Sequence, residues 1–518
     1  MPAVTTAPED SAKFVKSVFW NILSVGVALA GGVLLSPYLI RKLGKEGYGV
    51  WALSFAVIEY YWLLDLGFRS ATVKFVAHYW TLKESRKISE VVSTSLLYSS
   101  AAATLIIVSI SLAAPWVQQM FQIPEAYQRI FVRLIVITSA SWCISIVFGV
   151  FGAVLEAVQR FDLSMRPALA GTIIRTFGTF LLLYLNYGLI EIGLLAGLSQ
   201  VVTFALQYRA FRGLFRDLPV SPGHASVPMI KQMMGFGIHT FAVNISQQFL
   251  TQSAPLLIGH FQQAVFVGFY ALPVRLLQYT VEMVARIGTV TNSNAAALSA
   301  RNDQRGLGEL AIFSNRYCLT CFVPIAIFLG VYGPQLFDLW VGEEFAKNSA
   351  PILPVLLLGS MIAIVGQYSS TMLLQGLAKH QIYARGLILE AILGVITMWF
   401  VIPVYGLMGA AWVSSIFMIA NRCLFISWLT SRMVGMSFGG FLSSVYASAL
   451  LTAVPVLAAA WGLHSTILPG TSWAQLASAG LLIAAAYYAL AYLFVLTSDH
   501  RSLVILWTRR LAVRLRLS

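Results

Sequence analysis

Long apolar segments recur along almost the whole chain, and they constrain the fold more than any other feature. A transmembrane helix needs about 20 consecutive apolar residues, and by that rule we expect an all-α membrane protein with about 14 transmembrane helices. Only 10% of the 518 residues are charged, against roughly 25% in soluble domains, so lipid must solvate much of the surface. The expected segments are 17–38, 47–68, 90–114, 130–154, 166–186, 188–210, 235–258, 265–288, 311–333, 351–374, 385–404, 406–429, 441–463 and 473–497.

The 34 Lys and Arg residues concentrate in alternate loops, and this asymmetry predicts the orientation. With a cytoplasmic N-terminus, all but six fall on the cytoplasmic side, and the six are Arg41, Lys42, Lys45, Arg129, Arg133 and Lys347. We therefore expect a multi-pass protein of the bacterial inner membrane with both termini in the cytoplasm. Topology and anionic lipid head groups account for the net charge of +14, so we expect membrane lipids and no nucleic acid as partners.

The chain also repeats itself with an offset of 219 residues. Under this offset the segment Gly49-Val50-Trp51-Ala52-Leu53 aligns with Gly268-Phe269-Tyr270-Ala271-Leu272. The repeat predicts two six-helix bundles related by an axis along the membrane normal, with the substrate path at their interface. We expect an N-terminal bundle over 1–216, a cytoplasmic linker over 217–234, a C-terminal bundle over 235–432, two additional helices over 433–497 and a basic amphipathic cytoplasmic tail over 498–518.

Signs of catalysis are weak in this sequence. It holds no G-x-x-x-x-G-K-[ST], G-x-S-x-G or H-E-x-x-H motif. The loops near 115–129 and 334–350 are too short for an extracellular catalytic domain. The four cysteines lie in apolar segments, where a buried and inert role is expected. We therefore expect a transporter rather than an enzyme, with no catalytic residue, no metal site and no cofactor.

The most informative polar residues lie in segment 265–288. Arg275, Gln278, Tyr279 and Glu282 share one helical face. A cation at mid-membrane costs about 2.5–3.5 kcal/mol on insertion scales, so Arg275 must face protein or water. Its planar guanidinium suits a phosphate, and we expect Arg275, Gln278 and Tyr279 to line a substrate cavity. An ion pair between Arg275 and Glu282 that fixes helix packing is the alternative.

A second polar face in segment 235–258 includes Asn244 and Gln247. Their amides suit sugar hydroxyls, and they suit hydrogen bonds between helices equally well. Asn21 in segment 17–38 and Trp51 in segment 47–68 complete the expected lining of the cavity.

Acidic residues inside the predicted helices are candidates for ion coupling. Glu59 lies at mid-depth of segment 47–68, and Glu282 lies in segment 265–288. Glu59 could bind a coupling proton or cation, and it could equally be the charge partner of Arg275. Arg175 and Glu390 are further charges within predicted helices, and a role in bundle packing is the favoured interpretation for both.

Three sequence motifs together resemble a known family. They are Leu43-Gly44-Lys45-Glu46-Gly47-Tyr48-Gly49-Val50-Trp51-Ala52-Leu53, then Leu64-Asp65-Leu66-Gly67-Phe68, then Leu155-Glu156-Ala157-Val158-Gln159-Arg160-Phe161-Asp162. Over nearly its whole length the chain resembles the polysaccharide transporter family, which comprises Wzx-type O-antigen and exopolysaccharide flippases of the MOP exporter superfamily. The resemblance implies a V-shaped arrangement of two six-helix bundles, alternating access, and cationic residues that hold a pyrophosphate.

The function implied by this resemblance is translocation of an undecaprenyl-pyrophosphate-linked oligosaccharide from the cytoplasmic to the periplasmic leaflet. The expected partners are then the lipid-linked oligosaccharide and the glycosyltransferases and polymerase of the same pathway. A multidrug or small-molecule antiporter of the same superfamily is the alternative, although twelve helices and an acid deep in the first would be usual there. A membrane-embedded glycosyltransferase or polymerase is a weaker alternative, because the loops are short.

Overall fold

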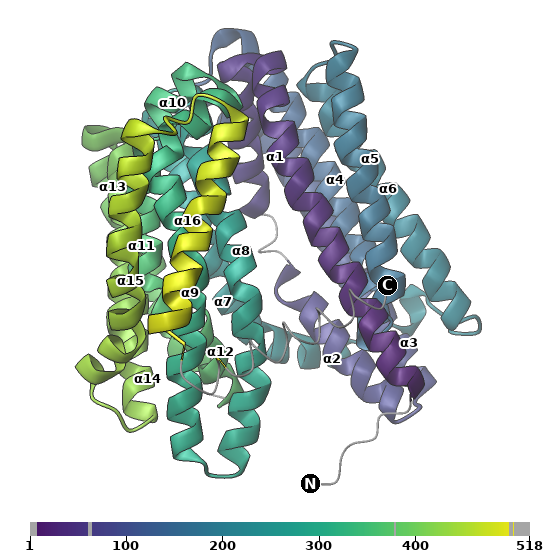
Figure 1. The fold of residues 1–518 in the computed structure, drawn as a ribbon. Coiled ribbons are helices and arrows are strands. Elements are labelled where there is room, and N and C mark those ends of the chain that lie inside the picture. The colour runs from purple at the N-terminus through teal and green to yellow at the C-terminus, as the bar shows by residue number, and fades with distance from the viewer. Residues whose placement is uncertain (1–7, 61–64, 378–379, 497–500, 502–518) are drawn as a thin grey trace, which may run out of the picture. The chain divides into compact units, whose positions relative to one another are not determined.

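The protein is almost entirely helical. The computed structural model describes residues 8–60, 65–377, 380–496 and 501, apart from some side chains inside its helices. Within these residues the helices run in the following order (Figure 1): α1 Pro8–Ile58, α2 Phe68–Thr81, α3 Ser85–Gln119, α4 Glu125–Ala157, α5 Phe161–Tyr184, α6 Leu189–Leu214, η2 Pro222–His224, α7 Val227–Phe261, α8 Ala264–Ala300, α9 Gln304–Val341, α10 Glu343–Ser349, α11 Ile352–Gln367, α12 Ser369–Gly376, α13 His380–Met418, the π-helix η3 Ile419–Ile426, α14 Ser427–Met433, α15 Phe438–Thr466 and α16 Trp473–Phe494.

Ten candidate membrane spans are found in the described part of the chain. This confirms an all-α, multi-pass membrane protein, while the number fourteen stays a prediction. One of the ten, Gln381–Met433, is 53 residues long, and the backbone leaves helical geometry inside it at Gly406 (φ 56°). The same happens in α1 at Gly44 (φ 73°). Gly44 lies between two segments that the sequence predicts to be separate helices, and Gly406 is the first residue of such a segment. Each has a positive φ that favours glycine.

The prediction of one continuous helix over 47–68 is wrong. Helix α1 ends at Ile58 and α2 begins at Phe68, with Leu66 (φ 46°) and Gly67 (φ 77°) in left-handed conformations before it. A Cβ atom on Gly67 would lie 2.6 Å from the carbonyl oxygen of Gly237 in α7. Only glycine permits this combination of backbone conformation and close approach. The break therefore has a packing cause that hydropathy does not register.

The chain divides into two compact units, Met1–Ala271 (unit 1) and Leu272–Ser518 (unit 2). In unit 1, α4 packs against α3 and α6, and α5 packs against α1 and α6. A hydrophobic core joins α2, α3, α4, α6 and α7. The segment predicted as a linker packs on α3, where the backbone nitrogen of Ser221 donates to Ser93 and that of Ser226 donates to Thr94. The domain boundaries expected near 216 and 235 remain predictions.

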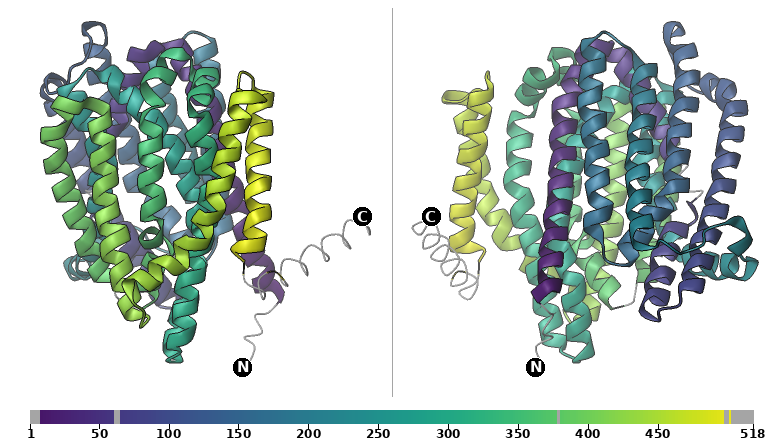
Figure 2. Two further views of the ribbon diagram at one scale, coloured as in Figure 1. Left: turned by 60° about the vertical axis from the view of Figure 1, so that its left-hand side comes forward. Right: turned by 90° about the vertical axis from the view of Figure 1, so that its right-hand side faces the viewer.

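The helices of unit 2 assemble around α9, which packs against α11, α15 and α16. Helices α15 and α16 lie side by side (Figure 2) and correspond to the two additional segments outside the repeat. Polar side chains fasten α15 to the rest of the unit. The Arg316 guanidinium in α9 donates to the carbonyl oxygen of Ser444 (N–O 3.0 Å from Nε). The Tyr446 hydroxyl donates to the carbonyl oxygen of Ile362 in α11.

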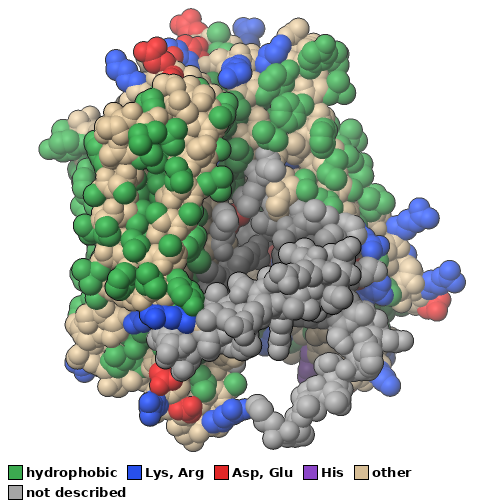
Figure 3. All heavy atoms as spheres, viewed as in Figure 1, with side chains coloured by type: hydrophobic (Ala, Val, Ile, Leu, Met, Phe, Trp, Pro, Cys, Tyr) green, Lys and Arg blue, Asp and Glu red, His purple; other side chains and the backbone are tan. Residues whose placement is uncertain are grey.

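Large apolar side chains cover the outer faces of the helices. Leu451 and Val454 on α15, Leu481 on α16 and Phe400 on α13 are each at least 66% exposed. In the space-filling view, hydrophobic side chains spread along α15 and α16, and charged side chains gather toward the ends (Figure 3). An exposed apolar surface of this extent is stable in lipid and not in water.

Candidate functional site

The polar face of α8 carries the residues expected to bind substrate. Arg275 is exposed, Gln278 and Tyr279 are half-buried, and Glu282 is exposed. All four lie within Ala264–Glu282, the part of α8 that is long and apolar enough to span a membrane. An exposed guanidinium in such a segment requires water or a polar partner. The placement agrees with a cation that can meet a polar ligand, while the role of Arg275 in binding stays a prediction.

Glu59, a candidate for ion coupling, contacts the polar face of α7. Its carboxylate accepts hydrogen bonds from Gln252 and from Gln248, the latter at 3.4 Å between Nε2 and Oε2. The neighbouring Tyr60 hydroxyl lies 3.0 Å from the Ser253 hydroxyl oxygen. Two amides thus surround the carboxylate at the end of α1. This arrangement places Glu59 among hydrogen-bond donors inside unit 1, and its role in coupling stays a prediction.

The other predicted lining residues lie in α1 and α7. Asn244 and Gln247 are half-buried in α7. Trp51 is half-buried and stacks edge-on with Phe55, with ring centroids 4.6 Å apart. Asn21 belongs to α1, and its side chain lies outside the described residues. The structure therefore brings Glu59 together with the amide-rich face of α7, and it describes Trp51 as part of an aromatic pair on α1.

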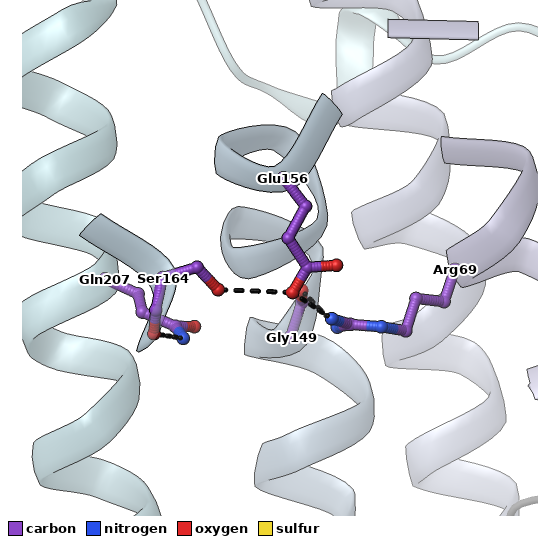
Figure 4. A network of polar contacts seen from close by, with 5 residues as sticks. All are labelled: Arg69, Gly149, Glu156, Ser164 and Gln207. Carbon is purple, nitrogen blue, oxygen red and sulfur yellow. Dashed lines mark hydrogen bonds and ion pairs between the residues drawn. The ribbon is translucent and has the colours of Figure 1, made fainter. Parts of the chain in front are cut away.

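The structure also shows a polar network that the sequence did not reveal (Figure 4). The Arg69 guanidinium of α2 donates to the Glu156 carboxylate of α4 (Nη2–Oε1 2.7 Å) and to the carbonyl oxygen of Gly149 (3.2 Å). The Ser164 hydroxyl of α5 donates to the same Glu156 oxygen (3.2 Å). Gln207 of α6 donates from Nε2 to the Ser164 carbonyl oxygen (3.0 Å). Four helices of unit 1 are thus joined by one chain of contacts.

Asp65 and Arg69 are four residues apart in the sequence, and α2 begins between them, at Phe68. Asp65 Oδ2 accepts from the backbone nitrogen of Arg69 (3.4 Å), and the guanidinium turns to Glu156 instead. Glu156 belongs to the motif Leu155–Asp162, so the sequence marks it as a residue of interest. Nothing in the sequence indicates that it pairs with Arg69.

A cavity of about 300 Å³ adjoins the network, and we call it the polar cavity of unit 1. Two arginines, one glutamate and six residues with hydroxyl or amide side chains line it, together with four apolar or glycine residues. The lining residues are Arg69, Glu156, Ser164, Met165, Ala168, Gly171, Thr172, Arg175, Ser199, Gln200, Thr203, Phe204 and Gln207. Arg175, which the sequence analysis assigned to packing, is exposed on α5 at this cavity.

The loop between α4 and α5 joins two helices that carry lining residues of this cavity, Glu156 and Ser164. Gln159 has a left-handed backbone (φ 59°), and Arg160 donates to Asp162 through Nε (3.0 Å) and Nη2 (3.3 Å). The hydrogen bond from Arg160 to Asp162 raises the pKa of Arg160. The arginine therefore stays charged at physiological pH. The pair lies at the start of α5, whose first turn carries Ser164.

Unit 2 contains a buried ion pair. Glu390 of α13 and Arg422 of η3 are 4% and 8% exposed, and their charged groups are 3.4 Å apart. Asn421 donates to the second carboxylate oxygen of Glu390 (2.6 Å). Adjacent residues on an ordinary α-helix point about 100° apart, and here the wider π-helical turn lets both reach one carboxylate. Sequence reasoning missed Arg422, although a charged residue in an apolar segment was an available signal.

Comparisons with known proteins decide the family. Residues 14–291 match the model of a family described as polysaccharide biosynthesis protein. The chain belongs to this family. A Shigella flexneri protein named "Putative O-antigen transporter" is 22% identical over 428 residues, covering 81% of this chain and 98% of that one. An uncharacterized membrane protein, EpsK, of Bacillus subtilis is 21% identical over 512 residues, covering 95% and 97%.

Solved structures share the fold. The lipid II flippase MurJ in an inward closed conformation has a TM-score of 0.71 at 13% identity, covering 92% of this chain and 99% of that one. An inward-facing multidrug transporter of the MATE family in the MOP superfamily has a TM-score of 0.65 at 17% identity, covering 80% and 96%. The resemblance inferred from the sequence motifs is thus confirmed at the level of the family, and the two solved structures show the fold.

Proposed function

We propose that this protein is a flippase that moves an undecaprenyl-pyrophosphate-linked oligosaccharide from the cytoplasmic to the periplasmic leaflet of the inner membrane by alternating access. The observation that supports it most directly is the exposed guanidinium of Arg275 within a membrane-spanning segment of a chain from the polysaccharide biosynthesis family. A relative named as an O-antigen transporter and a structural neighbour named as a lipid II flippase agree with this cargo class.

The chemistry of the cargo explains why such residues are needed. The hydrocarbon tail is soluble in the bilayer, whereas the pyrophosphate and sugars are not, because charged and hydroxylated groups lose their hydrogen bonds to water there. In the proposed mechanism Arg275 replaces part of the water around the pyrophosphate, since its fork can donate two parallel hydrogen bonds to phosphate oxygens. The half-buried amides Gln278, Asn244 and Gln247 offer donors and acceptors to sugar hydroxyls.

Energy coupling is proposed to involve a carboxylate, and Glu59 is the stronger candidate of the two. Its carboxylate is surrounded by the amides of Gln248 and Gln252, which would hold it in place whether or not it is charged. Glu282 is exposed on the same helix as Arg275. Proposed partners of the cargo pathway are the glycosyltransferases that build the oligosaccharide and the polymerase that extends it.

The test is export of surface polysaccharide by cells whose only copy of the gene carries a variant. We expect Arg275→Gln to abolish export at normal protein level, because the charge that meets the pyrophosphate is gone. Arg275→Lys should restore part of it, since the charge remains and the fork is lost. The matched control is Arg305→Gln, which removes an exposed arginine outside the apolar segment of α8. Full export by Arg275→Gln would remove Arg275 from the cargo path.

The alternative of a multidrug antiporter shares the same fold, so the fold does not separate the two. Drug-resistance assays on the same cells do. We expect no resistance phenotype on overexpression, because an exposed arginine at mid-segment repels the cationic compounds that many such exporters carry. A strong efflux phenotype that Glu59→Gln abolishes would favour the antiporter.

A further inference from the structure

Three basic residues of α1 lie where the charge distribution of the sequence predicts few of them. Arg41, Lys42 and Lys45 are among the six basic residues that fall outside the predicted cytoplasmic side. Basic residues are depleted from that side of membrane proteins, so three of them within five positions need a physical reason. Arg41 and Lys42 are exposed, and neither forms an ion pair with another described residue. Both positive charges are therefore available to an anion from outside the chain.

The packing of α1 on α5 sets the depth of these charges in the membrane. The rings of Tyr38 and Phe180 have centroids 5.3 Å apart, and Lys42 Nζ donates to the Asn186 amide oxygen at 3.1 Å. The partners advance along both helices together, so α1 and α5 run parallel. Helix α5 is a candidate membrane span that ends at Tyr184. The basic residues that precede Gly44 are therefore level with the end of this span, at the height of lipid head groups.

Large apolar side chains form an exposed face of α5 below these charges. Ile173, Phe177, Leu181 and Tyr184 are spaced i, i+4, i+8 and i+11, which puts them on one face of the helix. They are 40%, 67%, 58% and 71% exposed. At 1.5 Å per residue the stripe is about 16 Å long, which is about half of the hydrocarbon core of a bilayer. Its length therefore matches the depth of one leaflet.

Helix α1 adds Leu34 and Arg41 on the same side of the α1–α5 interface. They are seven residues apart and share a helical face, and Leu34 is 63% exposed. At 3.6 residues per turn, Arg41 is turned about 60° in one sense from Tyr38, which contacts α5. Phe177 is turned about 60° in the opposite sense from Phe180, which contacts α1. In parallel helices, opposite turns from the line of contact lead to the same side. We call Leu34, Arg41, Ile173, Phe177, Leu181 and Tyr184 the α1–α5 surface.

We propose that the α1–α5 surface binds an anionic glycerophospholipid, with the phosphate at Arg41 and beside Lys42 and an acyl chain along α5. The guanidinium can donate two parallel hydrogen bonds to phosphate oxygens, and the apolar stripe gives the chain a contact of matching length. Residues 38–46 and 184–191 carry three basic and two acidic residues, a net charge of +1 that attracts an anion. One of the acids, Glu191, already accepts from the backbone nitrogen of Gly188 (2.9 Å).

The length of the stripe favours a phospholipid over the undecaprenyl carrier, whose chain is far longer than one leaflet is deep. On the predicted orientation the bound lipid belongs to the periplasmic leaflet. None of the residues of the α1–α5 surface belongs to the proposed cargo site, so the inference goes beyond the proposed function.

The experiment measures lipid retention by the purified full chain in detergent, using native mass spectrometry. The probes are phosphatidylglycerol and phosphatidylcholine, which has no net charge, and we expect phosphatidylglycerol to be retained in preference. Arg41→Gln should weaken its retention about tenfold, the usual worth of one hydrogen-bonded charge. Arg41→Lys should keep most of it, because the charge remains. The matched control is Arg129→Gln, which removes an exposed arginine of the same group of six from α4 and should leave retention unchanged.

A second measurement locates the lipid. Phosphatidylglycerol with a photoreactive group in its acyl chain should crosslink to residues 173–184 of the wild type, and much less to those of Arg41→Gln. Leu451 of α15, which is 74% exposed, is the reference for nonspecific contact with lipid. Crosslinks at Leu451 as frequent as those on 173–184 would overturn the proposal.

The remaining outcomes are equally decisive. Equal retention of the two phospholipids, or equal losses in Arg41→Gln and Arg129→Gln, would refute the site. Displacement of phosphatidylglycerol by an equal amount of undecaprenyl phosphate would also refute it, because the surface would then belong to the carrier lipid. Arg275→Gln should retain phosphatidylglycerol like the wild type, so this result is independent of the flipping test.

Discussion

Corresponding places in the two units of this protein hold polar groups in opposite ways. In unit 1, Gly171 meets Thr203, and a cavity of about 300 Å³ lies beside them. In unit 2, the residues related by the repeat, Glu390 and Arg422, are buried and 3.4 Å apart. One unit leaves its polar groups beside a cavity, and the other satisfies them with each other. The difference teaches that residues aligned by the sequence repeat can line a cavity in one unit and form a structural ion pair in the other.

The physical reason lies in how a charge is satisfied. A buried charge must be paired or hydrogen-bonded, because its desolvation costs several kcal/mol. Glu390 and Arg422 pay that cost together, with Asn421 as an additional donor. In unit 1 the side chains of Arg69 and Glu156 are 37% and 18% exposed, so water still solvates part of both charges. Unit 2 should therefore respond to the loss of one charge far more than unit 1.

The largest expected effect is on the buried pair of unit 2. Arg422→Leu should lower the free energy of unfolding by about 3 kcal/mol or more, because Glu390 is left as an uncompensated buried charge. Thermal unfolding of the purified chain in detergent measures this. Adding Glu390→Leu should recover most of the loss, since an apolar pair of similar volume is often neutral. Arg305→Leu, at a side chain that is 91% exposed, is the control. An Arg422→Leu protein as stable as the wild type would contradict the claim that unit 2 depends on its buried ion pair.

A slightly smaller loss is expected from Gly366→Ala in α11. A Cβ atom there would lie 1.7 Å from the carbonyl oxygen of Arg422 and 2.9 Å from its Cα. Backbone atoms cannot rotate away, so the π-helix would have to shift, at a cost of about 2–3 kcal/mol. The same thermal assay measures it, with Gly394→Ala as control, where a Cβ meets nothing within 4 Å. Equal melting temperatures for the two variants would mean that η3 is not closely packed on α11.

The matching substitution in unit 1, Gly171→Ala, should cost about 1 kcal/mol. Its Cβ would lie 2.0 Å from the Thr203 hydroxyl oxygen, a side-chain atom that can rotate toward the cavity. The double variant Gly171→Ala, Thr203→Ala should therefore be more stable than Gly171→Ala alone, as measured by thermal unfolding. If the second substitution gave no recovery, the strain would lie in the backbone of α5 and α6 instead.

The smallest effect is expected for Glu156→Gln. The amide can still accept from Arg69 and Ser164, and the ion pair it replaces is partly exposed, so the loss should be below about 1 kcal/mol. The same unfolding assay, run beside Glu390→Gln, compares the two units directly. If Glu156→Gln lost as much stability as Glu390→Gln, the ion pair of unit 1 would be shielded from water as fully as the pair of unit 2.

Hydropathy and turn residues predicted much of the fold. Segment 130–154 lies inside α4, Glu125–Ala157, and the turn signal at Pro403–Gly406 marks the kink of α13. The break before Phe68 could not be read from hydropathy, because Gly67 is required by the approach of Gly237 from a distant helix. Hydropathy indicates how apolar a helix is, but it does not indicate which helix backbones come into contact.

The polar residues were predicted less well than the helices. The spacing of Arg275, Gln278 and Tyr279 predicted a shared helical face, and all three lie in α8 with Arg275 exposed, while their place in a substrate cavity stays a prediction. The Arg69–Glu156 contact joins residues 87 positions apart, and a single sequence contains no signal for such a pair. Glu390 and Arg422 were both visible as charges in apolar segments, but the π-helical turn that brings Asn421 and Arg422 to one carboxylate has no sequence pattern of its own.

The central claim is that the protein carries a pyrophosphate-linked oligosaccharide across a bilayer by using Arg275. Its most direct test uses proteoliposomes that hold the purified chain and an undecaprenyl-pyrophosphate oligosaccharide, with the sugar digested from outside by a membrane-impermeant glycosidase. Without flipping, about half of the sugar in the two leaflets is accessible. We predict that the wild-type chain and Arg305→Gln make nearly all of it accessible, and that Arg275→Gln remains at the protein-free level. Rapid flipping by Arg275→Gln, or none by the wild type under any ion gradient, would contradict the account.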